Sequence, residues 1–149
     1  MEHRVFVYGT LRRGQVNHRR LSGHPLLGEH RTDPCFSLYD LGAYPGLVRG
    51  GATPVCGEIY LVNARTLRYL DRLEDYPRLY SRILIPSPWG QSWVYCYRGM
   101  VRHRPLIPSG DWLEWADAPG SFRSAAIRRA RDPKTQVPWS DRAAPVVRG

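Results

Sequence analysis

Short apolar runs separated by glycine, proline and polar residues are the main pattern along the chain. The first run is Val5–Tyr8, which stops at Gly9 and predicts a buried strand. The second is "PVCGEIYLV", residues 54–62, in which Gly57 marks a bulge or a close approach of neighbouring backbone. Both runs are shorter than an ordinary helix, so we expect two strands.

A helical period follows the second run. Asn63 is a favourable N-cap residue, and Leu67, Leu70 and Leu73 lie on one face of a helix. Pro77 cannot continue that helix. We therefore expect a helix that starts after Asn63 and runs to about Leu73.

The rest of the pattern favours strands. Residues 35–41 alternate apolar and polar positions, and residues 43–46, "AYPG", predict a turn. Residues 79–85 and 92–98 predict a hairpin across "PSPWG", and residues 14–21 predict a loop that enters a short polar helix. This order of elements predicts an α+β fold, a small mixed β-sheet curled into a barrel with flanking short helices.

Composition divides the chain into two parts. Residues 1–117 predict one domain, whereas residues 118–149 predict a basic, mobile tail with room for a short helix over residues 124–130. Residues 120–149 carry 7 of the 22 basic side chains and only 2 of the 13 acidic ones, so much of the net charge of +9 lies there. Such a tail attracts nucleic acid weakly and without sequence preference, so we expect no specific nucleic-acid partner.

Missing patterns narrow the class of protein. No apolar run approaches the ~20 residues of a membrane helix and no signal-peptide region is visible, so we expect a cytoplasmic protein without a membrane partner. Cys35, Cys56 and Cys96 are widely spaced in apolar stretches, so we expect three buried reduced thiols and no metal site. Phosphate-loop, dinucleotide-binding and G-x-S-x-G motifs are also absent.

Two segments carry candidate chemistry. The loop Tyr8-Gly9-Thr10-Leu11 ends a strand and suits backbone N–H groups that converge on an anion or a polarised carbonyl, although such a turn is also a common structural feature.

Glu74 follows the apolar face of the expected helix. Burial there raises a carboxyl pKa toward the range of a general base. The alternative is an exposed acid paired with Arg78 or Arg72. Glu58 is a second candidate carboxylate. Strand alternation places it on the face opposite Gly57 and Ile59, so an exposed side chain without a catalytic role is the alternative expectation. Asp111 is expected to cap backbone rather than to catalyse.

Three stretches together, "VFVYGTLRRGQVNHRRL", "GEIYLVNARTLRYLDRLEDYPRLYSR" and "IPSGDW", resemble the γ-glutamylcyclotransferase-like (AIG2-like) family, in particular its short bacterial and γ-glutamylamine-cleaving branch. The resemblance covers about residues 3–115. The Tyr8-Gly9-Thr10-Leu11 loop matches the substrate-binding loop of the family, Glu74 its catalytic glutamate and Tyr80 the tyrosine that follows. Asp75 departs from the family pattern, since many members carry glycine there.

The resemblance implies an enzyme of the acyltransferase or lyase type that needs no metal or cofactor. Its substrate would be a γ-glutamyl amide, whose own α-amine attacks the γ-carbonyl and releases 5-oxoproline and a free amine, with Glu74 as general acid and base. The alternative is a non-catalytic protein that binds a γ-glutamyl or acidic metabolite. Tyr8 is expected to be either a core aromatic residue or a substrate contact, and Tyr80 is expected to contact either the substrate or Glu74. The amine and the oligomeric state cannot be read from the sequence.

Overall fold

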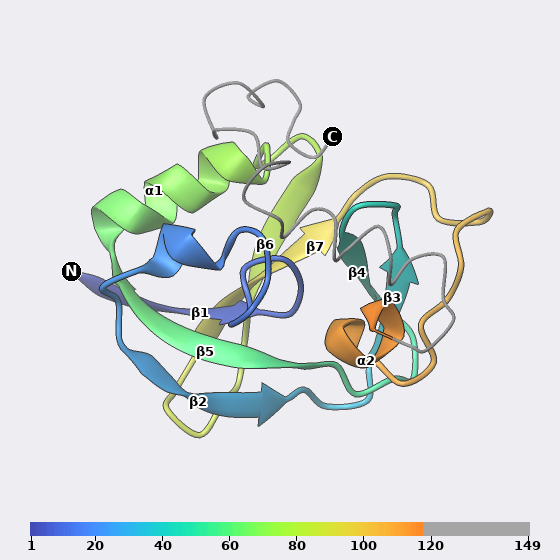
Figure 1. The fold of residues 1–149 in the computed structure, drawn as a ribbon, viewed down its shortest axis with the longest axis horizontal. Helices are drawn as coiled ribbons and strands as arrows, with labels where there is room; N and C mark the ends of the chain where they lie inside the picture. The colour runs from blue at the N-terminus through green and yellow to red at the C-terminus, as the bar shows by residue number, and fades with distance from the viewer. Residues whose placement is uncertain (118–149) are drawn as a thin grey trace.

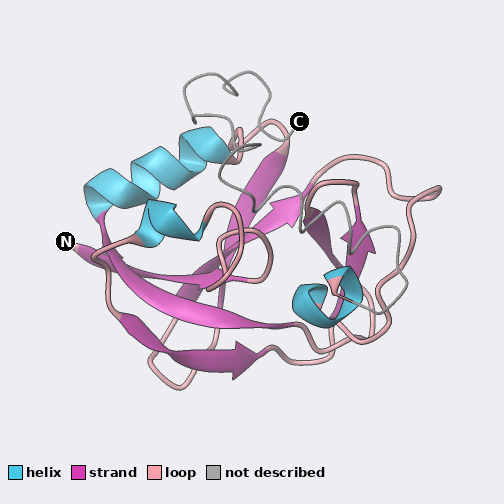
Figure 2. Ribbon diagram, viewed as in Figure 1, coloured by secondary structure: helices cyan, strands magenta, loops and turns pink. Residues whose placement is uncertain are grey.

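The computed structural model describes residues 1–117 and confirms the expected α+β fold (Figures 1 and 2). The elements in chain order are β1 (Glu2–Val7), the 3-10 helix η1 (His18–Leu21), β2 (Leu26–Arg31), β3 (Phe36–Asp40), β4 (Pro45–Arg49), β5 (Cys56–Asn63), α1 (Ala64–Leu73), β6 (Tyr80–Ile85), β7 (Ser92–Tyr97) and α2 (Trp112–Ala116). No helix within these residues is long and apolar enough to cross a lipid bilayer.

A five-stranded sheet with the order β2-β5-β1-β7-β6 forms the body of the domain, and β3 and β4 form a separate two-stranded sheet. Strand β1 pairs antiparallel with β5 and in parallel with β7, at Val5 and Trp93. The β6–β7 hairpin confirms the expected one. Its tip carries Trp89 against Gly28 of β2, so close that a Cβ at Gly28 would lie 2.5 Å from the indole. This contact brings the two outer strands of the sheet together and curls it.

Both faces of the sheet are covered at β1, because the residues from Val5 to Tyr8 alternate between two different apolar clusters. Val5 and Val7 pack on the side covered by α1, with Tyr60 of β5 and the helix leucines. Phe6 and Tyr8 point to the side covered by β3, β4 and α2. Val7 and Tyr8, at the end of β1, thus belong to different clusters, and the candidate loop begins there.

Helix α1 begins and ends as the sequence predicts. The Asn63 side chain accepts a hydrogen bond from the Thr66 N–H at 2.8 Å, which caps the first turn. Leu67, Leu70 and Leu73 are buried, and each contributes about 1.5–3 kcal/mol of hydrophobic stabilisation.

Several expectations were wrong in detail. Pro45 and Gly46 begin β4 instead of forming the turn, which lies at residues 41–44 and is closed by the Leu41 N–H donating to the Tyr44 carbonyl at 3.0 Å. Cys96 is buried, but Cys56 is partly exposed, and Cys35, which lies in the connection between β2 and β3, is exposed. The expected tail and its short helix lie outside the described residues.

Candidate active site

The loop after β1 is held close to β4. A Cβ on Gly9 would lie 2.7 Å from two ring carbons of Pro45, so only glycine allows this approach. The Arg12 N–H donates to the Gly9 carbonyl at 3.0 Å, and the Asn17 side-chain amide donates to the Thr10 hydroxyl at 3.1 Å. Within residues 1–117, no group accepts a hydrogen bond from the backbone N–H of Thr10 or Leu11. These two N–H groups are therefore available to another hydrogen-bond acceptor.

Glu74 ends α1, where its N–H donates to the Leu70 carbonyl at 2.9 Å. Its side chain is half-buried, and within the described part of the chain it has no hydrogen-bond donor and no paired cation. Burial raises the pKa of the Glu74 carboxyl to about 8. Arg78, one of the partners considered above, instead makes an ion pair with Asp75 at 3.0 Å.

The backbone turns sharply after Glu74. Asp75 has a φ of 53°, in the left-handed region that glycine adopts without strain. This conformation explains why glycine suits the position and why aspartate, which also tolerates it, can replace glycine.

Three tyrosines interact electrostatically with the Glu74 carboxyl. Burial raises the pKa of Tyr8, Tyr80 and Tyr95, and the negative charge of Glu74 raises each of them further. All three hydroxyls are therefore within electrostatic range of Glu74. Since Tyr8 begins the loop and Tyr80 begins β6, the expected site residues come together from distant parts of the sequence.

The hydroxyls of these tyrosines are themselves hydrogen-bonded. The Tyr8 hydroxyl donates to the Tyr95 carbonyl at 2.8 Å and accepts from the Leu47 N–H at 3.1 Å, which links β1, β7 and β4. The Tyr80 hydroxyl donates to the Pro45 carbonyl at 3.1 Å. Its proton is thus engaged, and its oxygen remains an acceptor.

Tyr95 was not found from the sequence, although it belongs to the apolar alternation of the expected hairpin. Its hydroxyl donates to Asp71 Oδ1 at 2.7 Å, and Asp71 also accepts two hydrogen bonds from Arg82 at 2.8 and 3.1 Å. The Arg82 guanidinium lies over the ring of Trp93, 4.2 Å from its centroid. These contacts fasten the end of α1 to β6 and β7, one turn before Glu74.

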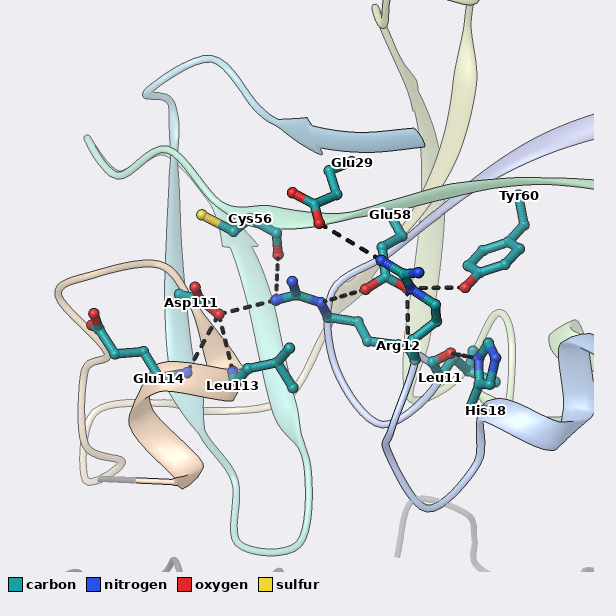
Figure 3. Close-up of polar contacts among 11 residues, drawn as sticks. Leu11, Arg12, His18, Glu29, Cys56, Glu58, Tyr60, Asp111, Leu113 and Glu114 are labelled. Carbon is teal, nitrogen blue, oxygen red and sulfur yellow. Dashed lines mark hydrogen bonds and ion pairs between the residues drawn. The ribbon is translucent and has the colours of Figure 1, made fainter. Parts of the chain in front are cut away.

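The rival carboxylate Glu58 is not exposed, contrary to expectation. Only 2% of it is accessible, because the loop after β1 covers this face of β5. Its carboxylate accepts from Arg12 Nε at 3.3 Å, from the Arg13 N–H at 3.0 Å and from the Tyr60 hydroxyl at 3.0 Å (Figure 3). Glu58 is therefore fully engaged in protein contacts, whereas Glu74 is not.

Asp111 caps α2 as predicted, with its carboxylate accepting from the Leu113 N–H at 3.0 Å. Within residues 1–117, no group of three or more histidine, cysteine or acidic side chains has a geometry suited to a metal ion.

Solved structures with the same fold define the class of protein. The solution structure of the protein ytfP from Escherichia coli has a TM-score of 0.63 and 43% identity, and the match covers 75% of this chain and 97% of that one. The crystal structure of an AIG2-like protein from mouse has a TM-score of 0.65 and 32% identity, covering 74% and 88% of the two chains. This chain thus has the AIG2-like fold.

Sequence comparison gives the family. The family model described as gamma-glutamyl cyclotransferase, AIG2-like, matches residues 5–114. A provisionally named gamma-glutamylcyclotransferase from Vibrio cholerae is 53% identical over 114 residues, which cover 76% of this chain and 98% of that protein. The gamma-glutamylcyclotransferase family protein YtfP of E. coli K12 is 44% identical over 111 residues, covering 74% and 96%. The chain belongs to the AIG2-like gamma-glutamyl cyclotransferase family.

Proposed function

We propose that the protein is a γ-glutamyl cyclotransferase that converts a γ-glutamyl amide into 5-oxoproline and a free amine, with Glu74 as general acid and base. The observation that carries this proposal is the Glu74 carboxyl, which is half-buried, has no cation partner within the described residues, and has a pKa raised to about 8. A carboxyl with such a pKa exchanges protons readily near neutral pH.

The reaction needs a group that moves protons. The α-amine attacks the γ-carbonyl, a new C–N bond closes the five-membered ring, and the original amide C–N bond breaks. Two protons leave the α-ammonium and two are gained by the departing amine, so the enzyme returns to its starting protonation state. Glu74 performs these transfers in sequence. A bound α-ammonium favours the ionised carboxylate, which prepares Glu74 to accept the first proton.

The loop and Tyr80 supply the remaining interactions. The N–H groups of Thr10 and Leu11 donate to the substrate carboxylate or to the oxyanion that forms at the γ-carbonyl. The Tyr80 hydroxyl, whose proton is engaged by Pro45, offers its oxygen to the α-ammonium. Tyr8 acts in this scheme as a wall of the site, since both hydrogen-bonding roles of its hydroxyl are used. Binding of this kind folds the γ-glutamyl group back on itself before reaction.

The test is a turnover assay on a panel of γ-glutamyl amines and γ-glutamyl amino acids, with 5-oxoproline measured by mass spectrometry. Glu74→Gln keeps the shape of the side chain and removes the base, so the rate should fall by roughly 10²–10⁴-fold. Glu2→Gln, an exposed glutamate at the start of β1, is the matched control and should behave as wild type. A folded Glu74→Gln protein with wild-type turnover would refute the assignment of Glu74, and binding without product would favour a non-catalytic protein.

A further inference from the structure

We infer that Arg12 is a positioning residue that holds the Thr10 and Leu11 N–H groups in the geometry needed for substrate. This inference rests on the proposed function, since it concerns the loop to which that function assigns substrate binding. It depends on a group of contacts that we call the Arg12 anchor: Arg12, Glu58, Asp111 and the Cys56 carbonyl (Figure 3).

Arg12 lies directly after the two donors. Its guanidinium bonds to two segments that are far apart in the sequence. In β5 it reaches Glu58 Oε2 through Nε at 3.3 Å and the Cys56 carbonyl through Nη1 at 3.4 Å, and before α2 it reaches Asp111 Oδ1 through Nη1 at 3.0 Å. The planar guanidinium fixes these directions together, which a single point charge cannot do. The position of the loop is therefore set by β5 on one side and by the start of α2 on the other.

The Arg12–Glu58 half of the anchor is buried, whereas the Asp111 side chain is 31% exposed. Arg12 is 6% exposed and Glu58 is 2% exposed. Glu58 also accepts the Arg13 N–H at 3.0 Å, so its carboxylate binds the loop through main chain as well as side chain. On the same C-terminal side of the donors, the Leu11 carbonyl lies 3.1 Å from His18 Nδ1. On the N-terminal side, the Gly9 carbonyl accepts from the Arg12 N–H at 3.0 Å. Both flanks of the Thr10–Leu11 donors are thus fixed.

Stabilisation of the fold alone does not explain why charged side chains are buried beside this loop. Buried charge pairs contribute little net stability compared with apolar residues of the same size. Their use here is directional, because the fork of Arg12 fixes one loop conformation whereas apolar packing would allow several. Small displacements of binding groups reduce catalytic efficiency strongly, by on the order of 10²-fold for a shift of about 1 Å.

The experiment compares Arg12→Lys with Arg13→Lys. Lysine at position 12 keeps the positive charge and loses the fork. Arg13 is the matched control because it is adjacent, its side chain is 57% exposed, and its carboxylate partner Glu29 lies at 3.8 Å. For Arg12→Lys we expect kcat/KM to fall on the order of 10- to 100-fold, with the same pH midpoint as wild type because Glu74 is untouched. Arg13→Lys should stay within about 2-fold of wild type.

Loop position is read independently of turnover from the amide chemical shifts of Gly9, Thr10 and Leu11 in 15N–1H spectra. These shifts should change in Arg12→Lys and stay unchanged in Arg13→Lys. If Arg12→Lys does not fold, Asp111→Asn takes its place, since asparagine still caps α2 and only the charge opposite Arg12 is lost. We expect it to lower kcat/KM by about 3- to 10-fold.

The outcomes separate this inference from the proposed function. If wild type produces no 5-oxoproline, the proposed function fails, and the amide shifts alone decide whether Arg12 sets the loop. If wild type is active and the folded variant keeps both wild-type kcat/KM and wild-type loop shifts, the inference is overturned. A lower melting temperature with unchanged kinetics and shifts would likewise overturn it, because it would leave Arg12 a purely stabilising role.

Discussion

Replacing Glu74 with glutamine should make the protein more stable at high pH. In the unfolded chain the carboxyl has its ordinary pKa of 4.5, whereas burial raises the pKa in the folded protein to about 8. Below pH 4.5 the group is protonated in both states and has no effect. Between these two values the unfolded state has lost the proton that the folded state keeps, so the free energy of unfolding falls as the pH rises. Glutamine cannot ionise, so the free energy of unfolding of the variant does not fall in this way.

The two pKa values set the size of the effect. The interval from 4.5 to about 8 corresponds to a loss of up to about 5 kcal/mol, at about 1.4 kcal/mol per pH unit. Since Glu74 is half-buried and keeps contact with solvent, the measured difference should be smaller, roughly 2–4 kcal/mol. Urea denaturation of wild type and Glu74→Gln at pH 5, 6.5 and 8.5 provides the comparison. The free energy of unfolding of the variant, relative to that of wild type, should increase steadily across this pH range. A difference that does not change with pH would show that the carboxyl is not desolvated and would remove the physical basis of the proposed base.

Three further results are expected. The kcat/KM of the wild type should rise with pH to a midpoint near 8, because the free enzyme must have Glu74 ionised, and a midpoint near 4.5 would contradict this. Gly9→Ala forces a Cβ to 2.7 Å from the Pro45 ring, so it should lower the free energy of unfolding by about 1–3 kcal/mol and also lower kcat/KM. If urea denaturation and turnover of this variant both match wild type, the close approach is refuted. Asp75→Ala should be less stable than Asp75→Gly by about 1–2 kcal/mol in the same denaturation assay, since only glycine adopts a φ of 53° without strain, and equal stabilities would argue against the left-handed turn.

Elements with strong local signals could be predicted from the sequence, and elements whose pairing depends on distant partners could not. Helix α1 follows from a cap and three leucines, all within eleven residues. Strand β2, "LLGEHR", is half-exposed and has no apolar alternation, so its pairing with β5 is not visible in its own residues. Strand β4 begins with Pro45 and Gly46, which are typical of turns, and it forms because β3 pairs with it and the Tyr8 hydroxyl accepts from its Leu47 N–H.

The two candidate carboxylates show where sequence reasoning stops. Glu58 and Glu74 both lie beside apolar positions, and their local patterns do not tell which one is free to react. The difference comes from Arg12, which is 46 residues from Glu58 in sequence yet bonds to it, whereas within residues 1–117 no cation pairs with Glu74. The Glu58 carboxylate accepts hydrogen bonds from a guanidinium and two further donors. The Glu74 carboxyl has no such partner within the described residues, and burial raises its pKa, as the proposed proton carrier requires. The loop that carries Thr10 and Leu11 is thus held by Glu58, and in the proposed function its free N–H groups bind the substrate on which Glu74 acts.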